Sequence, residues 1–271
     1  MSSFKAAAFD LDDTLLRDDL SVSDYTAGVF RRLTDTGFLL IPASGRAQLS
    51  MLPFVEQIRP VALYIACNGA EIWDGATDQL ISRETFSMEL GCEIAEFGKE
   101  FSCYAQTYEG EKFFFNEYGL YADRYAAASM LTGEYVGDLT KFIREPRTKI
   151  LMMAEPDKIS MMLSEACRRF ENRVSVTSSK PHFLEFNPLR ATKGIALSAA
   201  ADRLGISTEQ IVAFGDSLND LPMLQEAGLS VAVANARPVV RNLCDAVCPC
   251  NQEDGVALFL AKHILCEEAL F

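Results

Sequence analysis

The stretch that decides the fold is FKAAAFDLDDTL, residues 4–15. Its first part, Phe4–Asp10, is an apolar run that ends in an acidic residue, as is typical of a buried strand. In an extended chain, side chains two residues apart point the same way, so Asp10 and Asp12 can face one reacting centre. Two carboxylates placed in this way suit a nucleophile and its acid–base partner. Taken alone, the acidic strand end is equally compatible with a solvated loop or a helix N-cap cluster.

The residues that follow this stretch alternate between helical and strand patterns. The expected elements come in the order helix, strand, helix, strand: Val22–Thr36, Phe38–Ala43, Gln48–Gln57 and Val61–Cys67. Ser21 is the expected N-cap of the first helix, and Gly37 is its expected stop. Asn68-Gly69, after the last of these strands, is a strong turn signal. This alternation predicts a parallel, doubly wound sheet.

The end of the chain repeats this rhythm, whereas the middle does not. The final part predicts alternating helices and strands: Thr192–Leu204, Ile211–Phe214, Asn219–Ala227, Leu229–Val233 and Val256–Leu265. The middle predicts strands at Phe101–Tyr108, Lys112–Tyr118 and Lys149–Ala154, and Phe183–Phe186 then leads back towards the core. It also predicts a helix from Pro156 to Phe170, and a hairpin turn at Glu109-Gly110-Glu111.

We therefore predict an α/β fold with two parts. Residues 1–82 and 190–271 form a Rossmann-like, doubly wound parallel sheet with its helices. Residues 83–189 form a second α/β module, with antiparallel strands, that is inserted between them.

Composition excludes several classes of protein. The formal net charge of −13 disfavours nucleic acid as a partner but does not bear on small phosphates, because a metal ion and a few cations can invert the local potential. The N-terminus lacks a signal-peptide pattern, and no apolar stretch is long enough to span a bilayer. We therefore expect a cytoplasmic protein with no membrane partner. Its eight cysteines are scattered and are expected to be reduced thiols rather than a zinc site.

Three further patterns follow predicted strands or open a helix. Ser44, in Ala43-Ser44-Gly45-Arg46, can hold phosphate oxygens with its hydroxyl and the neighbouring N–H groups, although an N-cap is the simpler interpretation of Ser44 alone. Lys193, at a helix start, can neutralise a phosphoryl oxygen, although a single lysine there is usually solvated. Gly215-Asp216-Ser217-Leu218-Asn219-Asp220 supplies hard oxygen ligands that suit Mg²⁺.

The order of these motifs, DxDxT, Ser, Lys and GDxxND, resembles that of the haloacid dehalogenase (HAD) superfamily of phosphohydrolases. More narrowly, the chain looks like the Cof-type phosphatases, whose large, class IIB-like α/β cap lies between the second and third motifs. That narrower resemblance rests on three segments: Asn68-Gly69-Ala70, Asn235-Ala236 and residues 251–257. Within the middle module, it rests on size and placement alone.

The resemblance implies a role for each matching residue. Asp10 would attack phosphorus, and Asp12 would act as general acid and then as general base. Ser44, Lys193 and Asn219 would contact the phosphoryl group, with Asn251 as a further candidate. The implied Mg²⁺ ligands are Asp10, Asp12 through its backbone carbonyl, Asp216 and Asp220, the last supporting the metal shell or orienting Lys193.

The implied substrate is a small phosphorylated metabolite, such as a sugar phosphate or a phosphorylated cofactor like FMN or pyridoxal phosphate. Two alternatives stay open: a phosphomutase, and a catalytically silent regulator that binds a phosphometabolite. Two positions depart from the family pattern, since Asp13 and Arg190 stand where relatives often carry glycine. The sequence does not indicate an oligomeric state.

Overall fold

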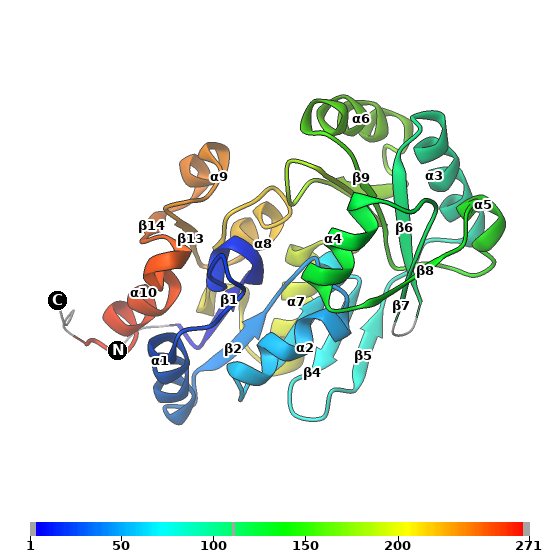
Figure 1. The fold of residues 1–271 in the computed structure, drawn as a ribbon. Coiled ribbons are helices and arrows are strands. Elements are labelled where there is room, and N and C mark those ends of the chain that lie inside the picture. Colours follow the sequence, from blue (N-terminus) through cyan, green and yellow to red (C-terminus); the bar gives the residue numbers. More distant parts are fainter. Residues whose placement is uncertain (1–3, 110–111, 268–271) are drawn as a thin grey trace.

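The protein has two lobes in the computed structural model, which describes residues 4–109 and 112–267. Both ends of the chain, blue and yellow to red in Figure 1, build one lobe, and the green middle builds the other. The predicted α/β class, with a parallel core sheet and an inserted module, is confirmed. We call the two lobes the core and the cap.

The core sheet is parallel throughout its described strands. Its order is β14 (Ala246–Cys248), β13 (Leu229–Val233), β12 (Ile211–Gly215), β1 (Ala6–Phe9) and β2 (Leu39–Pro42). Phe9 at the end of β1 lies beside Phe214 on one side and Pro42 on the other. The residues that follow these three strands therefore emerge together at one edge of the sheet, where open α/β folds place their sites.

Helices cover this sheet and bury its apolar side chains. They are α1 (Asp24–Asp35), α2 (Gln48–Gln57), α7 (Lys193–Leu204), α8 (Leu221–Glu226), α9 (Pro238–Leu243) and α10 (Gly255–His263). α1 packs against α10, and α7 packs against α8. The prediction of Ser21 as the N-cap of α1 is wrong: Ser23 accepts the N–H of Thr26 at 3.0 Å, while the N–H of Ser21 binds Asp19 in the preceding turn.

A small antiparallel sheet continues the core beyond β2. It consists of β3 (Leu63–Ala66), β4 (Glu71–Asp74) and β5 (Leu80–Arg83). The N–H of Ser44 binds the carbonyl of Ile65 at 2.8 Å, which joins β3 to the end of β2. Asn68, with φ of 57°, makes the predicted turn between β3 and β4. The prediction did not include β4 and β5.

The cap sheet is built almost entirely from antiparallel pairs. Its order is β10 (Val174–Thr177), β11 (Phe183–Pro188), β9 (Ile150–Met153), β6 (Tyr104–Glu109), β7 (Lys112–Phe115) and β8 (Thr132–Tyr135). Only the β7–β8 pair is parallel among the described strands, which departs from the expected antiparallel arrangement. The cap helices are α3 (Met88–Glu100), α4 (Leu120–Ser129), α5 (Leu139–Phe142) and α6 (Pro156–Arg169). Gly110 and Glu111 of the expected hairpin turn lie outside the described residues.

Alternation along the cap strands gives the sheet two distinct faces. Ile150 and Met152 join an apolar cluster with α3 and α6, whereas Leu151 and Met153 join a second cluster on the opposite face. In the same way, Leu184 belongs to the first cluster and Phe183 packs against the second. The second face is the one turned toward the core.

The cap is inserted after β5, which ends at Arg83, and its last strand, β11, ends at Pro188. We propose the division at 82/83 and 189/190 as the domain boundary, which lies one residue before the end of β5 and one residue after the end of β11. Among the described residues, no helix combines the length and the apolar character that a membrane span needs.

Candidate active site

The turn after β1 carries the first acidic motif. Asp10 is only 5% exposed at the end of the strand, and Asp13 takes a positive φ of 59°. Aspartate tolerates this left-handed geometry better than most residues, so the turn can form with Asp13 in the place where relatives often carry glycine. The turn brings the Thr14 hydroxyl within 3.1 Å of Asp216 Oδ1, where it donates a hydrogen bond. The first and last acidic motifs are thereby joined directly.

Lys193 lies in the middle of the buried carboxylates. Its N-terminal neighbour Thr192 caps α7, and the lysine side chain is fully buried. Its Nζ lies 2.5 Å from Asp10 Oδ1 and 2.6 Å from Asp220 Oδ1. The pKa of Lys193 is raised because these two carboxylates outweigh the opposing effect of burial. Lys193 therefore remains an ammonium ion.

Asp220 orders the loop that follows β12. Its Oδ2 accepts the backbone N–H groups of Asp216 and Ser217, both at 2.9 Å. Gly215 allows this close approach, since a Cβ there would lie 2.5 Å from the Cβ of Asp220. Both oxygens of Asp220 thus have partners within the protein, which suits a residue that orients Lys193 and the loop.

The same acidic residues form the described group that could hold a metal ion. Ligand oxygens of Asp10, Asp216 and Asp220 all lie within 4.8 Å of one another, and all three residues are buried. Burial raises the pKa of Asp10 well above its ordinary value, against the opposing effect of Lys193. Burial, followed by the charge of Asp220, raises the pKa of Asp216 to about 7. One lysine therefore leaves negative charge uncompensated, and a divalent cation with a preference for oxygen ligands fits this group.

Asp10 and Asp216 line a pocket between the core and the cap. Ser44 and Asn219 line the same pocket, and both carry groups that can donate hydrogen bonds. Ser44 Oγ accepts the N–H of Arg46 at 3.1 Å, which leaves the hydroxyl hydrogen for a ligand. Asn219 Nδ2 donates to Asn68 Oδ1 at 3.0 Å and keeps a second hydrogen. Asn251 is placed differently: it is buried outside the pocket and donates to the carbonyl of Leu16 at 2.9 Å.

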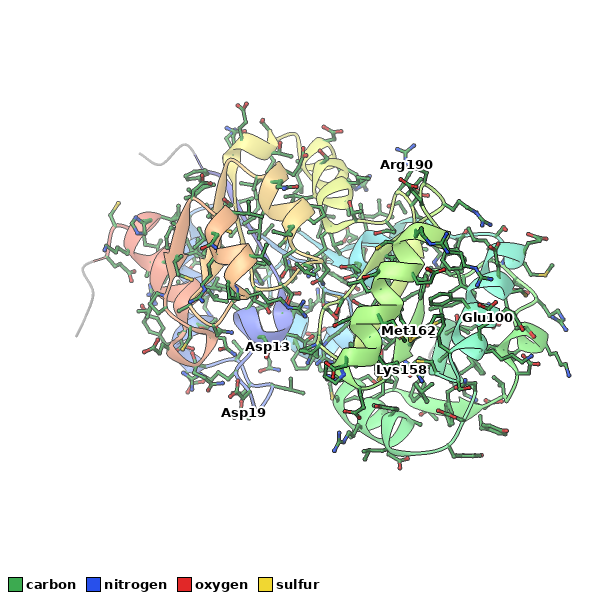
Figure 2. The ribbon with its side chains drawn as sticks, turned by 90° about the horizontal axis from the view of Figure 1, so that it is seen from above. Asp13, Asp19, Glu100, Lys158, Met162 and Arg190 are labelled. Atoms are coloured by element: carbon green, nitrogen blue, oxygen red, sulfur yellow. The ribbon has the colours of Figure 1, made fainter. Side chains whose placement is uncertain are left out.

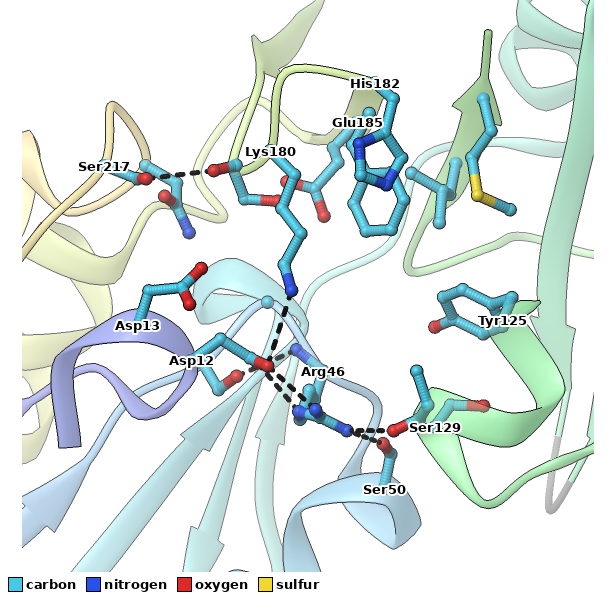
Figure 3. Close-up of a pocket in the computed structure, with 18 of the residues that line it drawn as sticks. Asp12, Asp13, Arg46, Ser50, Tyr125, Ser129, Lys180, His182, Glu185 and Ser217 are labelled. Atoms are coloured by element: carbon cyan, nitrogen blue, oxygen red, sulfur yellow. Dashed lines mark hydrogen bonds and ion pairs between the residues drawn. The ribbon is translucent and has the colours of Figure 1, made fainter. Parts of the chain in front are cut away.

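Asp12 is held by a cation that sequence reasoning did not assign to it. Arg46 Nε and Nη2 each donate to the Asp12 carboxylate at 2.8 Å (Figure 3). Nη1 of the same guanidinium reaches the carbonyl of Ala128 in the cap at 2.9 Å. Burial alone would raise the pKa of Asp12, but the hydrogen bonds and charge of Arg46 hold it below its ordinary value. Arg46 therefore links the core carboxylate to the cap.

Core and cap together enclose a pocket of about 400 Å³. Nζ of Lys180 in the cap lies 3.8 Å from Oδ1 of Asp12 (Figure 3). The hydroxyl of Ser217 in the core donates to the carbonyl of Ser179 in the cap at 2.9 Å. Arg190 is exposed and points away from the molecule (Figure 2), so this departure from the family pattern adds no cation to the pocket.

Comparison with known proteins supplies an independent finding. The sequence model of one family, described as haloacid dehalogenase-like hydrolase, matches residues 7–260. The chain is 28% identical over 264 residues to the 5-amino-6-(5-phospho-D-ribitylamino)uracil phosphatase YcsE of Bacillus subtilis (strain 168), and the match covers 96% of each chain. It is 28% identical over 247 residues to an HMP-PP phosphatase of Serratia proteamaculans (strain 568), covering 89% of this chain and 87% of that one. A solved haloacid dehalogenase-like hydrolase from B. subtilis matches with a TM-score of 0.85 at 27% identity, over 96% of this chain and 100% of the other.

Proposed function

Because the chain belongs to the haloacid dehalogenase-like hydrolases, we propose that it is a Mg²⁺-dependent phosphatase of a small phosphorylated metabolite. The observation that carries this proposal is the buried Asp10, which lies against the Lys193 ammonium and opens on the pocket. The pocket volume of about 400 Å³ is of the size that binds small metabolites. Relatives named as phosphatases of a ribityl phosphate compound and of HMP-PP support the same substrate class.

In the first step, an oxygen of Asp10 attacks phosphorus, and the bond between phosphorus and the ester oxygen breaks. Asp12, which must first take up a proton from solvent, gives that proton to the departing ester oxygen, so the alcohol leaves uncharged. In the second step, Asp12 takes a proton from a water molecule that attacks the aspartyl-phosphate. Inorganic phosphate leaves, and Asp10 is restored as a carboxylate.

The remaining residues position the transferring group and neutralise its charge. Lys193 and the hydroxyl of Ser44 would contact the phosphoryl oxygens, and Asn219 would add an amide N–H. Asp10, Asp216 and the backbone carbonyl of Asp12 would hold Mg²⁺, with Asp220 behind them. When bound, the cation would neutralise charge on the phosphoryl group and on Asp10, which otherwise repel each other.

The test is release of inorganic phosphate by the purified protein from a panel of phosphate esters, with Mg²⁺ and with EDTA. Asp10→Asn should lower turnover by at least about 1,000-fold. Asp19→Asn makes the same chemical change at an exposed turn outside the pocket and should leave turnover unaltered. Turnover that survives in Asp10→Asn would refute the proposed nucleophile.

The same assay separates the two alternatives. A phosphomutase would convert a sugar phosphate into its isomer and release little phosphate. A silent regulator would bind esters but turn over none of them, with or without metal.

A further inference from the structure

The cap side of the pocket contains a buried ion pair that the proposed mechanism does not use. Lys149 immediately precedes β9, and Glu185 lies on the neighbouring strand β11; their side chains are 3% and 2% exposed. Lys149 Nζ donates to Glu185 Oε1 and, at 2.7 Å, to the carbonyl of Gly45. Burial would lower the pKa of Lys149, but the neighbouring Glu185 carboxylate raises it, so Lys149 stays an ammonium ion. Both residues line the pocket.

The second carboxylate oxygen of this pair has no partner. Glu185 Oε2 is buried and accepts no hydrogen bond from any described residue. Strand alternation explains its direction, because Leu184 and Phe186 turn into the apolar cluster behind the sheet and Glu185 turns the other way. A buried charged oxygen without a donor is costly, so this atom is suited to a donor that arrives with a ligand.

A chain of hydrogen-bonded polar side chains on the cap face that is turned toward the core ends at the hydroxyl of Tyr125, which can act as a donor. The Tyr104 hydroxyl donates to Gln106 Oε1 at 2.8 Å, and Gln106 Nε2 donates to the Tyr108 hydroxyl at 2.8 Å. The Tyr108 hydroxyl then donates to the Tyr125 hydroxyl at 2.7 Å. The hydrogen of Tyr125 therefore has no acceptor among the described residues, and Tyr125 lines the pocket. Figure 3 shows Tyr125 and Glu185 entering the pocket from different walls.

The two unused groups lie close to the phosphate end of the pocket. A Cβ added to Gly45 would lie 3.4 Å from Glu185 Oε1, and Gly45 directly follows Ser44, the proposed phosphate contact. Lys149 Nζ lies 5.9 Å from the centre of the Tyr108 ring, and the Tyr108 hydroxyl donates to the Tyr125 hydroxyl at 2.7 Å, so Tyr125 lies in the same part of the pocket as the ion pair. A ligand group here must accept one hydrogen bond and donate another. A hydroxyl does both.

We propose that Glu185 and Tyr125 select phosphate esters that carry a hydroxyl on a carbon near the ester, as in a polyol or sugar phosphate. The substrate hydroxyl donates to Glu185 Oε2 and accepts from the Tyr125 hydroxyl. This inference rests on the proposed function and narrows it: ribityl or sugar phosphates fit, whereas pyridoxal phosphate, with no hydroxyl on a neighbouring chain carbon, does not. The apolar side chains of Leu151, Met153 and Phe183 also line the pocket and can contact the rest of the substrate.

The test compares propane-1,2-diol 1-phosphate with n-propyl phosphate, which differ by that hydroxyl. In the wild-type protein, kcat/KM should favour the diol ester by at least about tenfold, because the analogue leaves both groups unpaired. In Tyr125→Phe and in Glu185→Gln this ratio should fall below about threefold, mainly through the diol ester. Tyr135→Phe, the same change at a half-exposed tyrosine outside the pocket, should keep the wild-type ratio.

A binding measurement separates this inference from the proposed function. The dissociation constants of the two esters for Asp10→Asn protein, measured by calorimetry in Mg²⁺, should show the same preference without any turnover. Selective binding together with no phosphate release from any ester would refute the phosphatase but support the selecting pair. Turnover without preference for the diol, or an unchanged ratio in Tyr125→Phe, would overturn this inference alone.

Discussion

Replacing Lys193 by methionine tests the electrostatic account of the site most directly. The substitution keeps most of the buried chain and removes the ammonium that lies 2.5 Å from Asp10 and 2.6 Å from Asp220. Both carboxylates are then left buried without their cation. We expect loss of activity, because the phosphoryl group also loses a positive contact, and a large loss of stability in the absence of metal.

The size of the stability loss follows from the burial of the partners. Removing one member of a buried ion pair costs about 3–5 kcal/mol, and we take about 4 kcal/mol for fully buried Lys193. The entropy of unfolding is about 2.1 cal/mol/K per residue, or about 0.57 kcal/mol/K for 271 residues. The melting temperature should therefore fall by about 7 °C in EDTA.

The pH dependence of this loss has a definite sign. The pKa of Asp10 is already raised by burial, and it rises further without Lys193. A carboxyl whose pKa is higher in the folded than in the unfolded state favours folding while it is protonated. That contribution is lost as the pH rises through the window between the two pKa values. Lys193→Met should therefore be less destabilised at pH 5 than at pH 8.

The assay is thermal unfolding in EDTA and in Mg²⁺, with Lys180→Met as the matched control. Lys180 is partly exposed and lies 3.8 Å from Asp12, so its loss should cost less than about 1 kcal/mol. Mg²⁺ should raise the melting temperature of Lys193→Met more than that of the wild type, since the cation replaces the missing charge. A Lys193→Met protein that melts within about 2 °C of the wild type in EDTA would refute the reasoning.

Three more predictions concern the metal, the acid and the cap. Because the pKa of Asp216 is about 7, Mg²⁺ must displace a proton at low pH, and calorimetry should show binding about tenfold weaker at pH 6 than at pH 8. Arg46→Met should raise the pKa of Asp12, which must be protonated in the first step, so the basic limb of kcat/KM for an alkyl phosphate should move to higher pH. Phe97→Ala removes a fully buried ring that contacts three other phenylalanines, and chemical denaturation should show a loss of about 3–5 kcal/mol.

Each of these has a contrary outcome. Mg²⁺ affinity that does not change with pH would mean that Asp216 does not ligate. A shift of equal size for p-nitrophenyl phosphate, whose leaving group needs no proton, would mean that Arg46 acts on something other than the acid. A Phe97→Ala protein within about 1 kcal/mol of the wild type would mean that the cap core refills the space.

Local patterns predicted most of the core because strands and helices alternate along most of it, but they missed α9 and β14. α2 and β13 have the predicted bounds, and most other predicted core elements shift by one to three residues at an end. The resemblance to the Cof-type members of the haloacid dehalogenase superfamily is confirmed by the family match over residues 7–260. The same resemblance also implied an inserted α/β cap, which the structure contains.

Prediction was poorer where partners lie far apart in the chain. β6 pairs with β7 next to it but also with β9, and no local pattern specifies the second partner. The β4–β5 hairpin was missed because its strands are only four residues long and β5 is mostly exposed. Short, exposed strands lack the apolar run that marks a buried one.

For the site too, the residues on core strands could be predicted from the sequence, whereas those on the cap could not. Asp10, Ser44 and Asp216 could be placed together from sequence because each follows a strand of one parallel sheet. Glu185 and Tyr125 could not, since Glu185 stands between apolar residues in a cap strand with no motif around it, and Tyr125 is one of eight tyrosines. Their importance depends on how the cap lies over the core. The roles of the core residues stay a proposal until the variants are measured.

The insertion of the cap also has a consequence for synthesis on the ribosome. β1 must pair with β12, which is translated only after the whole cap, whereas the described strands of the cap sheet pair only with one another. The cap can therefore fold while the first core strands still wait for their partners. Asp10 meets Asp216 and Lys193 only when synthesis is nearly complete. A chain that stops between β11 and β12 would therefore contain every strand of the cap sheet but not the complete active site.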